Sequence, residues 1–232
     1  MPGARLTAVL FVHVGACSPC ATQRLLSRVW QLPLGGIGAT RAQRADVGAL
    51  VRAVEAQSAR FAAPATHDAD AALGGVWRVL YAEAPPPSNG QLGPLRGVAL
   101  QRINVPARRY ENELRVGEEE RPWLRVRLGA DWDALDAHTW RVHFRSLTVH
   151  ARLLGKEVRL LERAFPDGTT RMWRFSFADG TVRVVRAGQG GGTVSEVRRA
   201  LGTRETGQDD DCLFVLERLS SCEALRRSEA SE

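Results

Sequence analysis

Nine segments with the pattern of β-strands follow one another along this chain, with no helical pattern interleaved among them. Each is short and alternates apolar with polar residues, and turn-forming residues separate neighbouring segments. Parallel strands require crossovers of about a dozen residues or more, usually helical, so the sheet is predicted to be antiparallel. The segments are residues 74–81, 97–105, 109–116, 123–128, 138–149, 157–165, 170–177, 181–186 and 213–218.

Two Asp-Gly pairs give the clearest local prediction. Asp167-Gly168 and Asp179-Gly180 each separate two alternating segments, and this dipeptide supplies the positive-φ residues of a tight hairpin. Residues 157–186 are therefore predicted to form a three-stranded meander.

A long antiparallel sheet with one apolar face is expected to close on itself, because closure removes unpaired edges. About eight strands leave room for side chains and one small apolar ligand. The predicted fold is mainly β, an antiparallel barrel of about eight to nine strands preceded by two short α-helices. The barrel is expected over residues 73–219, with 189–211 as an inserted loop and 220–232 as a polar tail.

The segment before the strands has a helical period. Thr40 is placed to cap the second of two predicted helices. The region 21–63 is therefore expected to be a helical segment packed on the sheet. The apolar stripes of the two helices are Leu25, Leu26, Val29 and Trp30, and Val47, Leu50, Val51 and Val54.

Residues 1–20 are predicted to be a targeting segment. Arg5 precedes an apolar run of about ten residues, which has the length of a signal-peptide core and is too short to span a bilayer.

The chain has a net charge of +6. Residues 1–60 contain seven arginines against two carboxylates, a net charge of +5. Such a basic region suits an anionic surface or an organelle-import leader.

Metal and catalytic patterns are weak. Cys17 and Cys20 have the spacing of a metal or redox pair, but Cys212 and Cys222 supply no second half of a zinc site. No metal site or cofactor is predicted. The sequence lacks Gly-x-Ser-x-Gly and His-Glu-x-x-His motifs. No catalytic residue is therefore predicted.

A second group of candidate ligands is Asp131, Asp133, Asp136 and His138, which fall within eight residues. They could hold a cation, but the favoured interpretation is that they cap a loop between two strands.

Several motifs taken in order resemble the plastid lipid-associated protein family, also called plastid fibrillins. They are QRLL (23–26), GIGAT (36–40) with QRA (43–45), LGGVWRVLY (73–81), FADGTVRVVRAG (177–188) and LFVL (213–216), with Asn112 in the third strand. The resemblance covers residues 21–218. The chain departs from the family in the segment 189–212, where members usually have a short turn.

The resemblance implies a lipocalin-like barrel that holds or organises carotenoids, quinones or fatty acyl lipids at thylakoid or plastoglobule surfaces in the plastid. It implies a peripheral lipid-surface protein with no catalytic activity. It also implies that Trp77 plugs the barrel floor and that Arg218, on the closing strand, lies over its indole ring. Such a contact is worth about 1 kcal/mol.

The inward faces supply the candidate ligand wall, although at any one position plain core is the favoured interpretation. The candidates are Trp77, Val79, Tyr81, Leu124, Val126, Trp140, Val142, Phe144, Trp173 and Phe175. Asp179, Arg183 and Arg186 match the family motif and could form a charged gate. The simpler expectation is that Asp179 serves a turn and both arginines face outward or form ion pairs.

Two other functions remain open from the sequence. An enzyme acting on an isoprenoid or lipid would need a titratable group inside the cavity. A nucleic-acid-binding barrel would need aromatic residues exposed between arginines. Alternation along the strand instead places Trp140 and Phe144 on the face opposite Arg141 and Arg145. Binding of nucleic acid is therefore not expected, and the sequence makes no prediction of oligomeric state.

Overall fold

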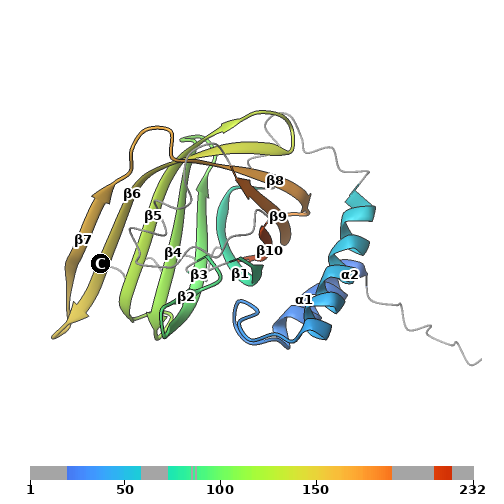
Figure 1. Cartoon of the computed structure of the whole chain (residues 1–232), viewed down its shortest axis with the longest axis horizontal. Coiled ribbons are helices and arrows are strands. Elements are labelled where there is room, and N and C mark those ends of the chain that lie inside the picture. Colours follow the sequence, from blue (N-terminus) through green and yellow to red (C-terminus); the bar gives the residue numbers. More distant parts are fainter. Residues whose placement is uncertain (1–19, 59–72, 85, 87, 190–211, 221–232) are drawn as a thin grey trace, which may run out of the picture.

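The computed structural model describes residues 20–58, 73–84, 86, 88–189 and 212–220 (Figure 1). The predicted targeting segment, most of the 189–211 loop and most of the polar tail lie outside these residues. The elements are α1 (Ala21–Trp30), α2 (Arg41–Ser58), β1 (Gly75–Glu83), β2 (Gln91–Leu92), β3 (Leu95–Asn104), β4 (Arg109–Gly117), β5 (Pro122–Ala134), β6 (Thr139–Leu153), β7 (Lys156–Ala164), β8 (Thr170–Ala178), β9 (Val182–Gln189) and β10 (Cys212–Arg218).

The strand pairings form a closed ring. In the order β1, β10, β9, β8, β6, β5, β4 and β3, each strand pairs with the next, and β3 pairs back to β1. All of these pairings are antiparallel. The prediction of a mainly β, antiparallel fold preceded by two helices is confirmed. No helix in the described part of the chain has both the length and the apolar character needed to cross a membrane.

The second hairpin of the predicted meander is confirmed, because β8 and β9 pair antiparallel across the Asp179-Gly180 turn. The predicted place of β7 beside β8 is wrong, because β7 pairs with β6, and this long strand has two neighbours on one edge. Its first residues, from Thr139 to His143, pair with β8, and the stretch from Ser146 to Leu153 pairs with β7. β7 lies outside the ring, and all of its residues are exposed. The physical reason is its composition: β7 has the sequence KEVRLLERA, which offers no regular apolar face to an interior.

The interior of the ring is one apolar cluster. Trp77 and Trp140 both belong to it, so the aromatic faces of distant strands converge as expected. The common face predicted for Trp77, Val79 and Tyr81 ends at Val79, because the register of β1 against β10 shifts between Val79 and Tyr81. Tyr81 consequently packs outside the ring, against the helices.

The helices cover the outer face of β1, β9 and β10 (Figure 1). Leu25 and Val29 of α1 and Val47 of α2 are buried there against residues such as Val184 and Val215. Trp30 differs from expectation, because it is half exposed and lies 5.3 Å from the guanidinium carbon of Arg78.

The predicted cap of α2 is confirmed. The backbone N–H of Gln43 donates to the Thr40 hydroxyl at 3.2 Å, and the Thr40 N–H donates to the Gln43 side-chain carbonyl at 2.8 Å. This reciprocal pair satisfies two donors at the start of the helix.

Candidate ligand-binding site

A cavity of about 80 Å³ lies inside the ring. Four of the predicted wall residues line it: Val79, Val126, Phe144 and Trp173. Further apolar lining comes from Pro86, Ala99, Leu100, Leu114, Leu128, Leu147 and Phe214, and polar lining from Ser88, Gln101, Asn112, Glu113 and Arg171. The wall is therefore mostly apolar with a few polar side chains.

The other predicted wall residues do not line the cavity. Trp77, Leu124, Trp140, Val142 and Phe175 lie in the same interior cluster as filler. Tyr81 is outside the ring, where its hydroxyl donates to Glu83 at 2.6 Å.

Stacked aromatic rings fill much of the interior. Trp132 and Trp140 stack with ring centroids 3.7 Å apart, and Trp140 meets Phe175 edge to face at 4.5 Å. The sequence interpretation missed Trp132, because the flanking aspartates resemble a loop. The signal was present, since the alternation of Leu124, Val126 and Leu128 continues to Trp132.

The expected contact between Arg218 and Trp77 is present. The guanidinium carbon of Arg218 lies 5.7 Å from the Trp77 ring centroid, and its Nη2 donates to the Gly74 carbonyl at 2.7 Å. The Trp77 indole N–H donates to the Leu73 carbonyl at 2.9 Å. These contacts join the first and last strands of the ring.

Arg183 is the main surprise of the site. It was expected on the outer face or in an ion pair, but it points into the ring and is fully buried. Its guanidinium lies 4.6 Å from the Trp77 ring and 5.6 Å from the Phe175 ring. The alternation of β9 explains this, because Val185 and Ala187 share the inward face while Val182 and Val184 face the helices.

Hydrogen bonding satisfies the Arg183 side chain only in part. Its Nη2 donates to Gln101 Oε1 at 2.5 Å. The buried Nε and Nη1 have no hydrogen-bond acceptor in the structure described. Burial lowers the pKa of Arg183 to about 9, so the group is still charged at neutral pH.

Tyr110 lies beside this group. Its ring meets Trp173 edge to face at 5.0 Å, and its hydroxyl donates to Asn112 Oδ1. Burial raises the pKa of Tyr110 well above 10.0. The phenol therefore stays protonated and keeps donating to Asn112.

Asp179 and Arg186 follow the simpler expectation. Asp179 Oδ1 accepts from the backbone N–H groups of Thr181 and Val182 at 2.9 and 2.7 Å, which fixes the turn before β9. Arg186 forms an ion pair with Glu55 of α2 at 2.9 Å. The structure thus separates the three charged residues that the sequence motif grouped together.

A charged cluster lies on the outer face of β3, β4 and β5, opposite the cavity. The buried Glu113 carboxylate lies 2.8 Å from Arg115 Nε, 3.0 Å from Arg125 Nε and 3.3 Å from Arg102 Nε. Burial raises the pKa of Glu113, but the hydrogen bond from Arg115 and the nearby arginine charges outweigh it, and the pKa is lowered from 4.5 overall. The carboxylate is therefore held ionised on the outer face.

The loop-capping role predicted for the second group of candidate metal ligands holds for Asp136 only, because Asp131 and Asp133 lie within β5 and form ion pairs with β6. Asp131 pairs with Arg145 at 2.9 Å, Asp133 with His143 at 3.0 Å, and Asp136 accepts from the His138 backbone N–H at 2.7 Å. No group of three metal-ligating side chains occurs within the described residues. Cys17 and Cys222 lie outside them, whereas Cys20 is exposed and Cys212 is buried, both as free thiols.

No protein-family model matches the chain, and no curated protein sequence matches it.

Proposed function

We propose that this protein binds an apolar molecule inside a lipocalin-like barrel and acts without catalysis at a lipid surface. The observation that carries the proposal is the mostly apolar cavity enclosed by the eight-stranded ring. The motifs shared with plastid lipid-associated proteins support the same assignment. They suggest a carotenoid, a quinone or a fatty acyl lipid as ligand, and the thylakoid or plastoglobule surface of the plastid as location.

The size of the cavity limits how a ligand binds. A water molecule occupies roughly 30 Å³, so 80 Å³ accommodates only a head group or a few carbon atoms. Typical sites for larger ligands have volumes of about 300–1,000 Å³. A long-chain ligand therefore has to move lining side chains such as Phe144, or leave most of its chain outside.

An exposed apolar hairpin supports contact with a lipid surface. At the β6–β7 turn Leu153 and Leu154 are exposed, and Trp123 lies nearby on β5 with about half of its surface exposed. Arg152 and Lys156 flank the two leucines. Apolar side chains with a basic rim suit the interface of an anionic membrane.

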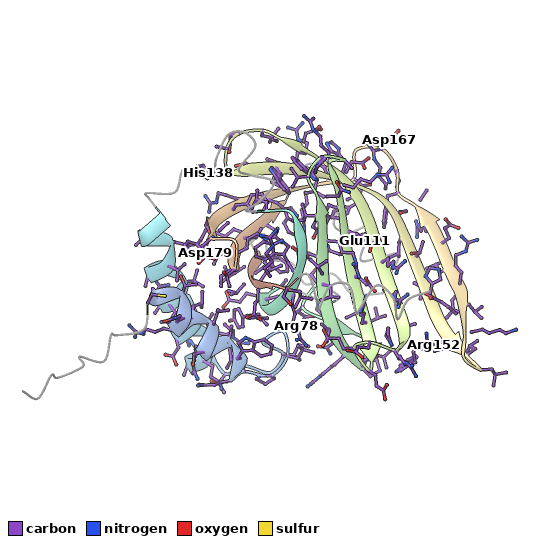
Figure 2. The ribbon with its side chains drawn as sticks, turned by 180° about the vertical axis from the view of Figure 1, so that it is seen from behind. Arg78, Glu111, His138, Arg152, Asp167 and Asp179 are labelled. Carbon is purple, nitrogen blue, oxygen red and sulfur yellow. The ribbon has the colours of Figure 1, made fainter. Side chains whose placement is uncertain are left out.

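The hairpin lies at the same end of the ring as the loop that borders the cavity. Antiparallel pairing places the end of β1 beside the start of β3, and the start of β5 beside the end of β6. Pro86 and Ser88, which line the cavity, follow the end of β1. Figure 2 shows Arg152 at this end, with His138 and Asp167 at the opposite end.

The alternative of an enzyme in a lipocalin-like barrel receives less support. It required a titratable carboxylate or histidine in the cavity. Among the described residues that line the cavity, Glu113 is the one acidic side chain, and arginines hold its carboxylate on the outer face.

Lipid extraction and mass spectrometry of the purified protein test the proposal. A co-purified apolar compound in a fixed ratio to protein is the expected result. Recovery of nucleic acid without lipid would overturn the assignment.

A further inference from the structure

The polar side chains of the cavity wall offer mainly hydrogen-bond donors. The side-chain carbonyl of Gln101 accepts from Arg183, and that of Asn112 accepts from Tyr110. Each carbonyl oxygen then has one of its two acceptor sites occupied, while the amide NH₂ of each residue offers two donors to the cavity. Arg171 and the indole of Trp173, which also line the cavity, are donors only.

Some of these donors have no acceptor in the structure described. The buried Trp173 Nε1 has none. Nε and Nη1 of Arg183, which does not line the cavity but donates through Nη2 to Gln101, have none either. A buried donor without an acceptor costs free energy. An acceptor group placed in the cavity would relieve part of this cost.

The charges inside the ring have the same sign. Arg183 is fully buried, and Arg171 is buried in the cavity wall. Glu113 is the one acidic side chain that the described part of the chain contributes to the cavity lining, and Arg115 and Arg125 neutralise it on the outer face. A buried cation is stable only when it is paired or well hydrogen-bonded. Since Nε and Nη1 of Arg183 have no hydrogen-bond acceptor among the described residues, the surroundings of Arg183 favour an anion.

From these contacts we propose that the cavity takes the carboxylate end of a single-chain fatty acyl compound. The carboxylate accepts hydrogen bonds from the amides of Gln101 and Asn112 and from Arg171. Arg183, which donates to the other end of the Gln101 amide, provides a nearby positive charge that attracts the carboxylate. The acyl chain runs along the apolar wall that includes Val126 and Phe144. This inference rests on the proposed function, because it names the class of ligand for the same cavity.

Neutral lipids match the wall less well. A ketone or ester carbonyl accepts hydrogen bonds but leaves the positive charge of Arg183 uncompensated. An alcohol head group also brings a donor into a wall of donors. A carboxylate answers both requirements, since it offers about four acceptor sites and a negative charge.

The test compares three compounds with the same chain length. Dodecanoate, 1-dodecanol and methyl dodecanoate are titrated into the full-length protein by calorimetry, with quenching of Trp fluorescence as a second readout. Dodecanoate is expected to bind at least about tenfold more tightly than either neutral compound, because charged hydrogen bonds are the stronger ones. Equal or tighter binding of the neutral compounds would overturn the carboxylate assignment while leaving the proposed function intact.

Variants on one strand provide the matched comparison. Arg183→Met is expected to abolish the preference for dodecanoate, whereas Arg186→Met, on the same strand but paired with Glu55 outside the ring, is expected to retain it. If Arg183→Met does not fold, Gln101→Leu and Asn112→Leu provide the test, and each is expected to weaken dodecanoate binding about tenfold. Both leucine variants should weaken 1-dodecanol binding less than dodecanoate binding, because a neutral hydroxyl accepts weaker hydrogen bonds than a carboxylate. Unchanged dodecanoate binding in both variants would refute the proposal.

The failure of the proposed function has a different signature. In that case none of the three compounds binds, and no lipid is recovered from the purified protein.

Discussion

The guanidinium of Arg183 lies 4.6 Å from the ring of Trp77, closer than the 5.7 Å of Arg218. Two arginines from neighbouring strands therefore contact one fully buried indole. Cation–π contacts of buried groups are worth about 2 kcal/mol or more, so this group is expected to stabilise the end of the ring where β1 begins.

Replacing Trp77 should be severely destabilising. Trp77→Ala is expected to lower the free energy of unfolding by roughly 3–5 kcal/mol, because it leaves a cavity and removes the face that both arginines contact. Chemical denaturation monitored by circular dichroism measures the change. Trp123→Ala, at a half-exposed tryptophan, is the control, with an expected cost below about 1 kcal/mol; equal losses in the two variants would contradict this account.

Two glutamates on the same strand should respond to acid in opposite ways. The folded-state pKa of Glu113 is lowered from 4.5, so its contribution to stability is present above that value and is lost as pH falls through the folded pKa. Burial is the largest cause of the raised pKa of Glu111, so its ionisation costs stability as pH rises through the folded pKa.

Paired variants measure this difference. Glu113→Gln is expected to be less stable than the parent at neutral pH, and the gap should narrow as the pH falls below 4.5. Glu111→Gln is expected to match or exceed the parent at neutral pH and to lose that advantage in acid. Thermal unfolding across a pH series provides the measurement, and parallel profiles for the two variants would refute the argument.

Leu154 is expected to lower the stability of the fold and to strengthen binding to a lipid surface. It is fully exposed and has a φ of 51°, next to Gly155 at 79°. Such two-residue turns favour Asn-Gly. Leu154→Asn should therefore stabilise the fold by about 1 kcal/mol and weaken binding to vesicles that contain anionic lipid.

Vesicle flotation and thermal unfolding together check this prediction. Leu135→Asn, at an exposed leucine on the β5–β6 loop at the other end of the sheet, should leave vesicle binding unchanged. If both variants float with vesicles as well as the parent does, the β6–β7 hairpin is not the contact surface.

Gly36 should tolerate alanine less well than Gly38. Both have positive φ values, 74° and 81°, so both substitutions carry a similar backbone cost. A Cβ on Gly36 would lie 2.6 Å from the Tyr81 ring, whereas a Cβ on Gly38 would meet nothing within 4 Å. Gly36→Ala is thus expected to lower the melting temperature further than Gly38→Ala, and equal shifts would show that the Tyr81 contact adds nothing.

The sequence predicted the type and order of elements better than their pairing. Alternation identified most strands, and the cap at Thr40 located the start of α2, because both signals are local. The position of β7 depends on how β6 divides its length between pairing with β7 and pairing with β8, which is a non-local property. The side of the sheet on which Tyr81 lies depends on a register shift between β1 and β10. The sequence of β1 alone gives no signal for this shift.

The same distinction applies to the candidate site. The two-residue alternation of the strands correctly predicted that Val79, Val126, Phe144 and Trp173 face the cavity. It could not distinguish residues that line the cavity from residues such as Trp140 that fill the interior. Arg183 was misplaced because a charged residue is usually exposed. Its inward position follows from the face shared with Val185, which the same alternation could have shown.

The pairing of β1 with β10 has a consequence for how the protein is made. Residues 75–83 pair on one side with residues 212–218, so a ribosome must have released the chain as far as residue 218 before the ring can close. Until then, the apolar inner face of the early strands is exposed to water. Contacts between such distant segments also form slowly. Nascent chains of this protein are therefore expected to depend on chaperones that hold β-rich intermediates.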